Sequence, residues 1–180
     1  MPPKDFSRLG DAEAEAFFDA FVARAEPRLD EFRREVSATG GPSEAELDGS
    51  PDSLVGLWRW FVARKPDERG ESPPWYEPDP PDSEAGRLPA GVLRDVDGLA
   101  LYLALAFRQA LAGLRWGIGR LPPRMKYVSQ NKPVLKGDGY DIDVLQVAYT
   151  LAMRAAAGRD TDDEALLRAF RAWVEPLRAG

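Results

Sequence analysis

The chain has 180 residues, with 24 Lys and Arg against 30 Asp and Glu, a net charge of −6, and it contains no His and no Cys. These two absences exclude disulfides, zinc fingers, His-ligated metals, thiol nucleophiles and Ser-His-Asp triads. The length and an apolar fraction of 44% predict one globular domain over 1–180.

The first predicted element is a long helix. Apolar residues between Ala14 and Val36 recur at spacings of three and four, which is the stripe of an amphipathic helix. Pro27 falls inside this stripe without shifting its phase, so the pattern predicts a kink or two abutting helices. The Gly-Gly-Pro at 40–42 ends the run.

A second helix is expected to begin near Ser50. Ser50 is a favourable N-cap, and Pro51 suits the first helical position, where a backbone N–H is not needed. The apolar face of this helix covers residues 54–62. Trp60 falls outside that face, so we expect that the following loop covers it or that it is exposed for a partner.

The segment 66–89 is rich in proline and acid. It holds seven Pro and seven acidic residues, which predicts a crossover loop without regular structure. The adjacent aromatic residues Trp75 and Tyr76 indicate that part of this loop is held against the body of the protein.

A third helix is predicted over about 90–113, and its wide apolar face indicates a central position. The pattern then changes to short segments at 114–120, 124–129 and 133–136, which predict a small antiparallel sheet of two or three strands.

Two further helices are expected to close the chain. One covers about 142–157 with Asp141 or Asp143 as its cap. The other begins at Thr161, which forms a T-x-x-E capping box with Glu164. We therefore predict an α+β fold, mostly helical with about five helices, and a small two- to three-strand antiparallel sheet around residues 114–136.

The most unusual feature of the chain is a basic window that coincides with the predicted sheet. Residues 115–136 hold six Lys and Arg and no acid, in a protein of net charge −6. With aromatic residues interleaved, this pattern is typical of a platform for phosphate, nucleic acid or an acidic protein surface. The same charges also suit the solvated edge of a sheet, or ion pairs with the Pro-rich loop. The candidate binding residues are Arg115, Trp116, Arg120, Arg124, Lys126, Tyr127, Gln130, Asn131 and Lys132.

A second candidate site follows directly. Asp138, Asp141 and Asp143 place three carboxylates within six residues, and carboxylate oxygens are ligands that Ca²⁺ and Mg²⁺ prefer. The spacing differs from that of an EF-hand loop, and a turn followed by a helix cap explains the same residues. We assign no cofactor and no catalytic residue from the sequence.

Four segments carry a resemblance to known proteins: S-P-D-S-L-V-G-L-W-R-W at 50–60, D-G-L-A-L-Y-L-A-L-A-F-R at 97–108, R-W-G-I-G at 115–119 and K-Y-V-S-Q-N-K-P-V-L at 126–135. In this order the chain resembles uncharacterised small α+β proteins of actinobacteria. More loosely, it is similar to immunity-type proteins of bacterial toxin systems. The resemblance covers about 50–178, rests on structural rather than catalytic motifs and transfers no active-site residue.

We therefore expect a non-enzymatic protein-binding module, immunity- or inhibitor-like, that uses the basic strand face together with acidic helices. Two alternatives stay open. One is a binder of nucleic acid or a phosphate ligand through the 115–136 sheet, and the other is a metal- or carboxylate-dependent enzyme around 138–143. A protein partner is the first expectation, nucleic acid is the second, and the oligomeric state is left open.

The expected location is cytoplasmic. The longest uncharged apolar stretch, 98–107, is about half of what a membrane span needs, so we expect no membrane partner. The first ten residues show no apolar signal-peptide core. Arg is far more frequent than Lys, which is typical of a GC-rich bacterial genome.

Overall fold

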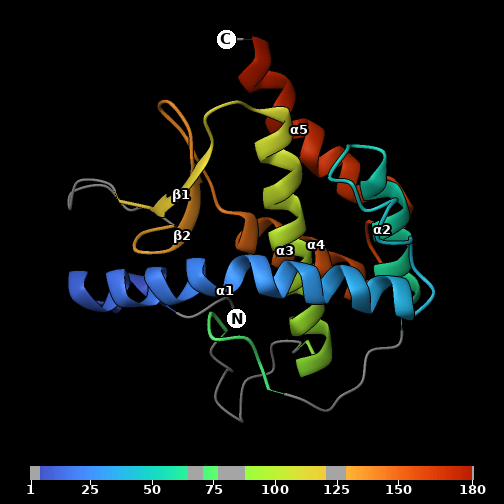
Figure 1. Ribbon diagram of the computed structural model, residues 1–180, viewed down its shortest axis with the longest axis horizontal. Coiled ribbons are helices and arrows are strands. Elements are labelled where there is room, and N and C mark those ends of the chain that lie inside the picture. Colours follow the sequence, from blue (N-terminus) through green and yellow to red (C-terminus); the bar gives the residue numbers. More distant parts are fainter. Residues whose placement is uncertain (1–4, 65–70, 77–87, 121–128, 180) are drawn as a thin grey trace.

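The computed structural model describes residues 5–64, 71–76, 88–120 and 129–179 (Figure 1). In this part of the chain a short 3-10 helix at Phe6–Arg8 precedes five α-helices and three strands. Their bounds are α1 Asp11–Ala38, α2 Ser53–Ala63, α3 Ala90–Ala110, β1 Arg115–Ile118, β2 Pro133–Lys136, β3 Asp141–Ile142, α4 Val144–Ala156 and α5 Ala165–Ala179. The predicted α+β class, mostly helical with a small antiparallel sheet, is confirmed.

The centre of the molecule is α3, as its wide apolar face predicted. It packs against α1, α4 and α5, and Figure 1 shows α1 crossing it. The crossing is close because Gly98 has no side chain. A Cβ atom at this position would lie 2.2 Å from Cδ2 of Phe32, a fully buried residue of α1. The aromatic ring of Phe32 therefore fills the space that any larger residue at 98 would occupy.

The sheet has the order β1-β2-β3, and both pairings are antiparallel. In β1, Trp116 packs edge-on against Phe21 of α1 with ring centroids 5.0 Å apart, so the sheet is anchored on the long helix. This agrees with the physical expectation that so small a sheet needs helices for support. Figure 1 shows the sheet on one side of α3, and α2 with α5 on the other.

The third strand is not where the sequence placed it. Residues 141 and 142 form β3, in which Ile142 pairs with Leu135, although the helical pattern had been extended to 142. Gly139 has a φ of 78°, which makes the turn that brings β3 back beside β2. The helix therefore begins only at Val144. The expected strand segment at 124–129 lies outside the described residues except for Ser129, which is in a turn.

Three helix boundaries differ from the expectation. The prediction of two abutting helices at Pro27 is wrong, because α1 continues through it with the proline on an exposed position. Ser50 lies in a turn before α2 rather than at its cap, since Ser53 N donates to Ser50 O at 3.2 Å. The capping box at Thr161 is also wrong. Here Asp162 Oδ1 accepts from Glu164 N at 3.2 Å, and α5 begins at Ala165.

The tryptophans divide into covered and exposed positions. Trp75 and Tyr76 are buried, which confirms that this part of the Pro-rich segment is held against the body. Trp60 is buried and contacts residues of α1 and its C-terminal end. It lies edge-on to Phe32, with ring centroids 5.7 Å apart, and donates its indole N–H to Thr39 Oγ1 at 3.0 Å. Trp173 has the spacing of a core residue but is 38% exposed.

None of the described helices is long and apolar enough to cross a membrane.

Candidate functional site

The structure uses several residues of the predicted basic face in internal contacts. Arg120 pairs with Glu15 at 3.1 Å and with Asp11 at 3.7 Å, both on α1. Lys136 lies 3.8 Å from Asp141 on the neighbouring strand. These cations pair with acids of α1 and β3, a pairing that the sequence analysis did not offer. Most of the Pro-rich loop, whose acids were the expected partners, lies outside the described residues.

The turn directly before β2 also uses its polar side chains in internal contacts. Lys132 is buried, and its Nζ lies 3.1 Å from Oδ2 of Asp143. Asn131 is also buried, and its side chain donates to the Leu9 carbonyl at 3.0 Å. Gln130 donates to the Asn131 side chain at 3.3 Å. These three residues hold the turn together rather than face solvent as a free polar surface.

Arg115 has a different environment. It is exposed, and of the cations between 115 and 136 that the structure describes, it is the one without an ion pair. Trp116 beside it is half-buried against α1. Arg124, Lys126 and Tyr127 lie outside the described residues. The described part of the predicted face is therefore one free guanidinium beside a packed indole.

The three aspartates of 138–143 are not grouped as metal ligands. Asp143 caps α4, because its Oδ1 accepts from Gln146 N at 2.9 Å and its Oδ2 accepts from Ser129 Oγ at 2.9 Å. Asp141 lies in a strand, and Asp138 is exposed in the turn before it. No group of three or more acids in the described ranges is arranged to hold a metal ion. For Asp143 the helix-cap interpretation is confirmed.

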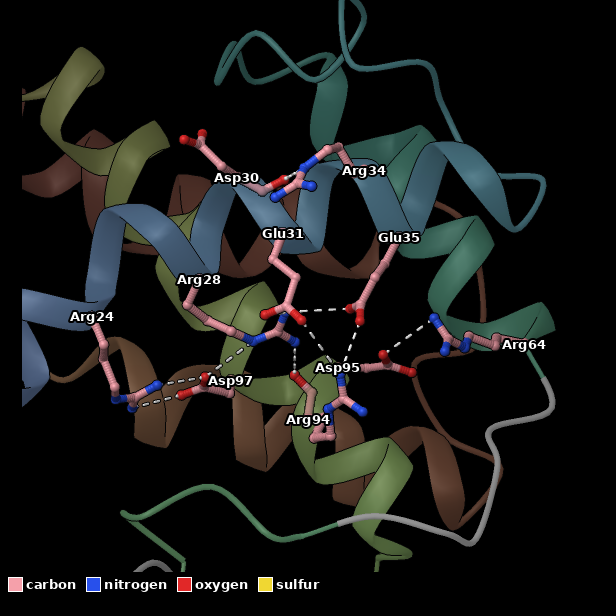
Figure 2. A network of polar contacts seen from close by, with 10 residues as sticks. All are labelled: Arg24, Arg28, Asp30, Glu31, Arg34, Glu35, Arg64, Arg94, Asp95 and Asp97. Atoms are coloured by element: carbon pink, nitrogen blue, oxygen red, sulfur yellow. Dashed lines mark hydrogen bonds and ion pairs between the residues drawn. The ribbon is translucent and has the colours of Figure 1, made fainter.

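The main polar feature of the structure is a network of ion pairs between α1 and α3, drawn in Figure 2. Its best-satisfied member is Asp97, whose side chain is 2% exposed. Arg24 donates two hydrogen bonds to this carboxylate, at 2.8 and 3.0 Å, and Arg28 Nε lies 3.5 Å away. The Trp75 indole N–H donates to Asp97 Oδ1 at 2.6 Å. This bond helps to fix the described residues 71–76 of the Pro-rich segment to the core.

The network continues along α1. Arg28 Nη1 lies 3.1 Å from Glu31 and 3.3 Å from Glu35, and its Nη2 donates to the Arg94 carbonyl at 2.9 Å. The Arg94 side chain forms an ion pair with Glu35, with Nη2 2.9 Å from Oε1. The charges of α1 and α3 thus compensate one another where the two helices meet, as buried charges require.

Asp95 is the exception in this network. Its side chain is 5% exposed, and among the described residues it has one ion-pair partner, Arg64 Nη1 at the end of α2, at 3.2 Å. Figure 2 shows the two groups facing each other. Burial raises the pKa of the Asp95 carboxyl to about 6, and Arg64 offsets only part of that effect. Arg64 Cζ lies over the Trp60 ring, 4.9 Å from its centroid, a cation–π contact that favours this position of the guanidinium.

A pocket of about 210 Å³ opens beside this pair. Asp95 and Arg64 supply its polar groups. Its apolar lining comes from α2, α3, α4 and the residues just before α3, and includes Phe61, Val62, Leu88, Val92, Ala152 and Ala155. An apolar cavity with a few convergent polar groups and a perturbed carboxyl is the arrangement expected of a ligand site.

The outer face of α1 carries a second feature, which we name the acidic ridge: Glu15, Asp19, Val22, Glu26 and Asp30. These residues follow one another at spacings of four and three, so they form one line along the helix. All five are exposed, including Val22 at 39%. Glu15 pairs with Arg120, whereas Asp19, Glu26 and Asp30 have no ion pair among the described residues.

The sequence analysis did not identify the ion-pair network or the pocket, although the sequence holds signals for most residues of the network. Asp95 and Asp97 stand inside the apolar run of α3, and a charged residue on a buried helix face indicates a buried partner. Arg24, Arg28 and Glu35 form a stripe beside the apolar stripe of α1. Nothing in the sequence indicated Arg64, because its partner lies 31 residues away on another helix.

The chain matches no protein-family model, no curated protein and no solved structure at a significant level.

Proposed function

We propose that this protein is a non-enzymatic protein-binding module, immunity- or inhibitor-like, and that it contacts a basic protein surface through the acidic ridge of α1. One observation carries the proposal. Asp19, Glu26 and Asp30 are exposed, lie on one line and have no ion pair among the described residues, while the exposed apolar Val22 lies between them. Charges around a small apolar centre are typical of the anatomy of a protein interface.

The helix that carries the ridge is well supported. Its opposite side is held to α3 by apolar packing around Phe32 and by the hydrogen bonds of Arg24 and Arg28. A partner that binds such a helix does not have to order it first, so less conformational entropy is lost on association. The free acids of the ridge would attract a basic partner and speed the encounter.

The basic strand face stays in the proposal as a competing surface. Arg115 is exposed and forms no ion pair with any residue that the structure describes, and Arg124 and Lys126 lie outside the described residues. Arg120 and Lys132 are less suitable contacts, because a partner would have to compete with their internal carboxylates. The experiment therefore compares the two surfaces directly.

The test is affinity capture from the host with the tagged protein as bait, with and without nuclease. The ridge variant combines Asp19→Lys, Glu26→Lys and Asp30→Lys. Its matched control reverses three other exposed acids, Glu44, Asp138 and Glu175, so that net charge changes equally. We expect one protein partner, retained after nuclease by wild type and control and lost with the ridge variant. The association rate constant of that partner should fall about tenfold or more at low salt for the ridge variant.

Other outcomes would contradict the proposal. Capture that the ridge variant retains but the triple variant Arg115→Glu, Arg124→Glu, Lys126→Glu loses would assign binding to the basic strand face. Recovery of nucleic acid alone, removed by nuclease, would favour the nucleic-acid alternative.

A further inference from the structure

We propose that the pocket between α2, α3 and α4 binds a small amphipathic monocarboxylate, with the carboxylate on Arg64 and the hydrocarbon part against the apolar wall. This site lies on a different part of the molecule from the acidic ridge, and the inference does not depend on the proposed protein partner.

The donor is the Arg64 guanidinium. It carries five N–H groups in a rigid fork, and its buried Nη1 has no hydrogen-bond partner within the described part of the chain. Its Nη1 is buried and lies 3.2 Å from Asp95 Oδ1 without the geometry of a hydrogen bond. The side chain as a whole is 24% exposed, so its other donors remain accessible. Unused donors next to a cavity indicate an acceptor on the ligand.

The position of this donor is fixed before any ligand arrives. The Trp60 ring supports one side of the guanidinium at 4.9 Å, and Asp95 limits its movement on the other. Planar bidentate recognition of a carboxylate is the interaction for which a fixed guanidinium is best suited. A phosphate could also accept hydrogen bonds from Arg64. Its negative charge would be larger, however, and Arg64 is one cation whose charge Asp95 already partly neutralises.

The apolar wall of the pocket favours a hydrocarbon chain as the remaining part of the ligand. Apart from Arg64 and Asp95, the described lining is hydrocarbon, and α4 contributes only alanines to it. A volume of about 210 Å³ corresponds to roughly seven water molecules at about 30 Å³ each. This is below the range of about 300–1,000 Å³ for drug-sized ligands. A six-carbon acid such as hexanoate has the right size.

Asp95 adds a dependence on pH. Its ionised carboxylate competes for Arg64 and repels a bound carboxylate, whereas its protonated form donates a hydrogen bond instead. The other charged groups facing it are Arg28 and Glu35 of α1 and Arg94 of α3, which pair with one another. Binding is therefore expected to tighten as pH falls from 7.5 to 6, and Asp95→Asn should remove that dependence.

The experiment is a titration of the full chain with hexanoate, followed by amide chemical shifts of residues 152–156 and by melting temperature. Hexanol and hexylammonium are the matched probes. We expect saturable hexanoate binding with a Kd of about 1 mM or tighter, and much weaker binding of both probes. Arg64→Gln should weaken hexanoate binding about tenfold or more. Arg59→Gln is the charge control, because Arg59 borders a neighbouring hollow instead.

A second variant keeps the test decisive if Arg64→Gln does not fold. Ala155→Leu fills the pocket from its partly exposed side and should abolish binding with the fold intact, as judged by circular dichroism. Equal binding of hexanol and hexanoate, binding that survives loss of Arg64 or filling of the pocket, or no saturable shift at many times the expected Kd would each overturn the proposal.

Discussion

At the scale of single residues, the contrast between two buried aspartates is the most informative feature. Asp97 receives two hydrogen bonds from Arg24 and one from Trp75, while Asp95, two positions earlier on α3, has within the described ranges only the ion pair with Arg64. Burial is similar for both side chains, so the difference lies in the number of donors. A carboxyl with few donors in a dry site is stabilised in its protonated form.

Asp95 therefore makes a testable contribution to the pH dependence of stability. The folded protein raises its pKa to about 6 from an ordinary value of 3.8, so the folded state binds this proton more tightly than the unfolded state. The contribution is fully present below about pH 4 and is lost as pH rises through about 6, with a size of about 3 kcal/mol. Relative to wild type, Asp95→Asn should gain about that free energy of unfolding between about pH 4 and pH 7.5.

Urea denaturation at several pH values measures this difference. Asp138→Asn, at an exposed position, is the control and should follow wild type throughout. Parallel pH profiles for wild type and Asp95→Asn would show that the burial of Asp95 does not affect its proton affinity.

At the scale of elements, the crossing of α1 and α3 decides the architecture. The two helices meet where Phe32 covers Gly98, and the ion pairs of Figure 2 lie beside this contact. Small residues at a crossing allow helix backbones to approach closely. A tightly packed aromatic ring at the crossing then leaves no space for a larger side chain. Breaking one ion pair here would leave a buried charge without compensation.

We predict that Gly98→Ala destabilises the protein, although alanine favours helix. A Cβ at 98 would lie 2.2 Å from Phe32 Cδ2, so either the ring or the helix must move. Overpacking of this kind costs about 1–3 kcal/mol, which exceeds the gain of about 1 kcal/mol in helix propensity. Chemical denaturation measures the change. In a double-mutant cycle, Phe32→Leu should recover part of the loss, and strict additivity of the two substitutions would contradict the steric explanation.

At the scale of the whole molecule, the hydrophobic core is continuous. One cluster of buried side chains extends from Phe6 before α1 to Val174 in α5, and includes Trp75 of the Pro-rich segment. A single core shared by all helices favours one cooperative unit, which is what the length of the chain predicted.

This continuity predicts one unfolding transition. Far-ultraviolet circular dichroism reports the helices, and tryptophan fluorescence reports all five tryptophans, Trp58 and Trp60 in α2, Trp75, Trp116 in β1 and Trp173 in α5. The two signals should give coincident denaturation curves with the same midpoint and slope. Separate midpoints would show that part of the chain unfolds independently and would contradict the single-domain prediction.

The sequence by itself determined the elements and their approximate order. Helical spacing in α1 and α3, the change of period after 113 and the aromatic pair Trp75 and Tyr76 are local signals, and each depends on residues close together in the chain. Element ends were less certain, because a cap such as Asp143 or Asp162 is decided by one hydrogen bond. The third strand was missed because it has only two residues and is defined by its pairing with β2.

The tertiary structure alone decided which charges are free. The basic window looked like one surface in the sequence, but Lys132 is buried on Asp143 and Arg120 meets Glu15, 105 residues away. Likewise, Arg64 and Asp95 come from different helices, and their pocket needs a wall from α4 as well. Electrostatic interaction depends on distance in space and on burial, and neither can be derived from spacing along the chain.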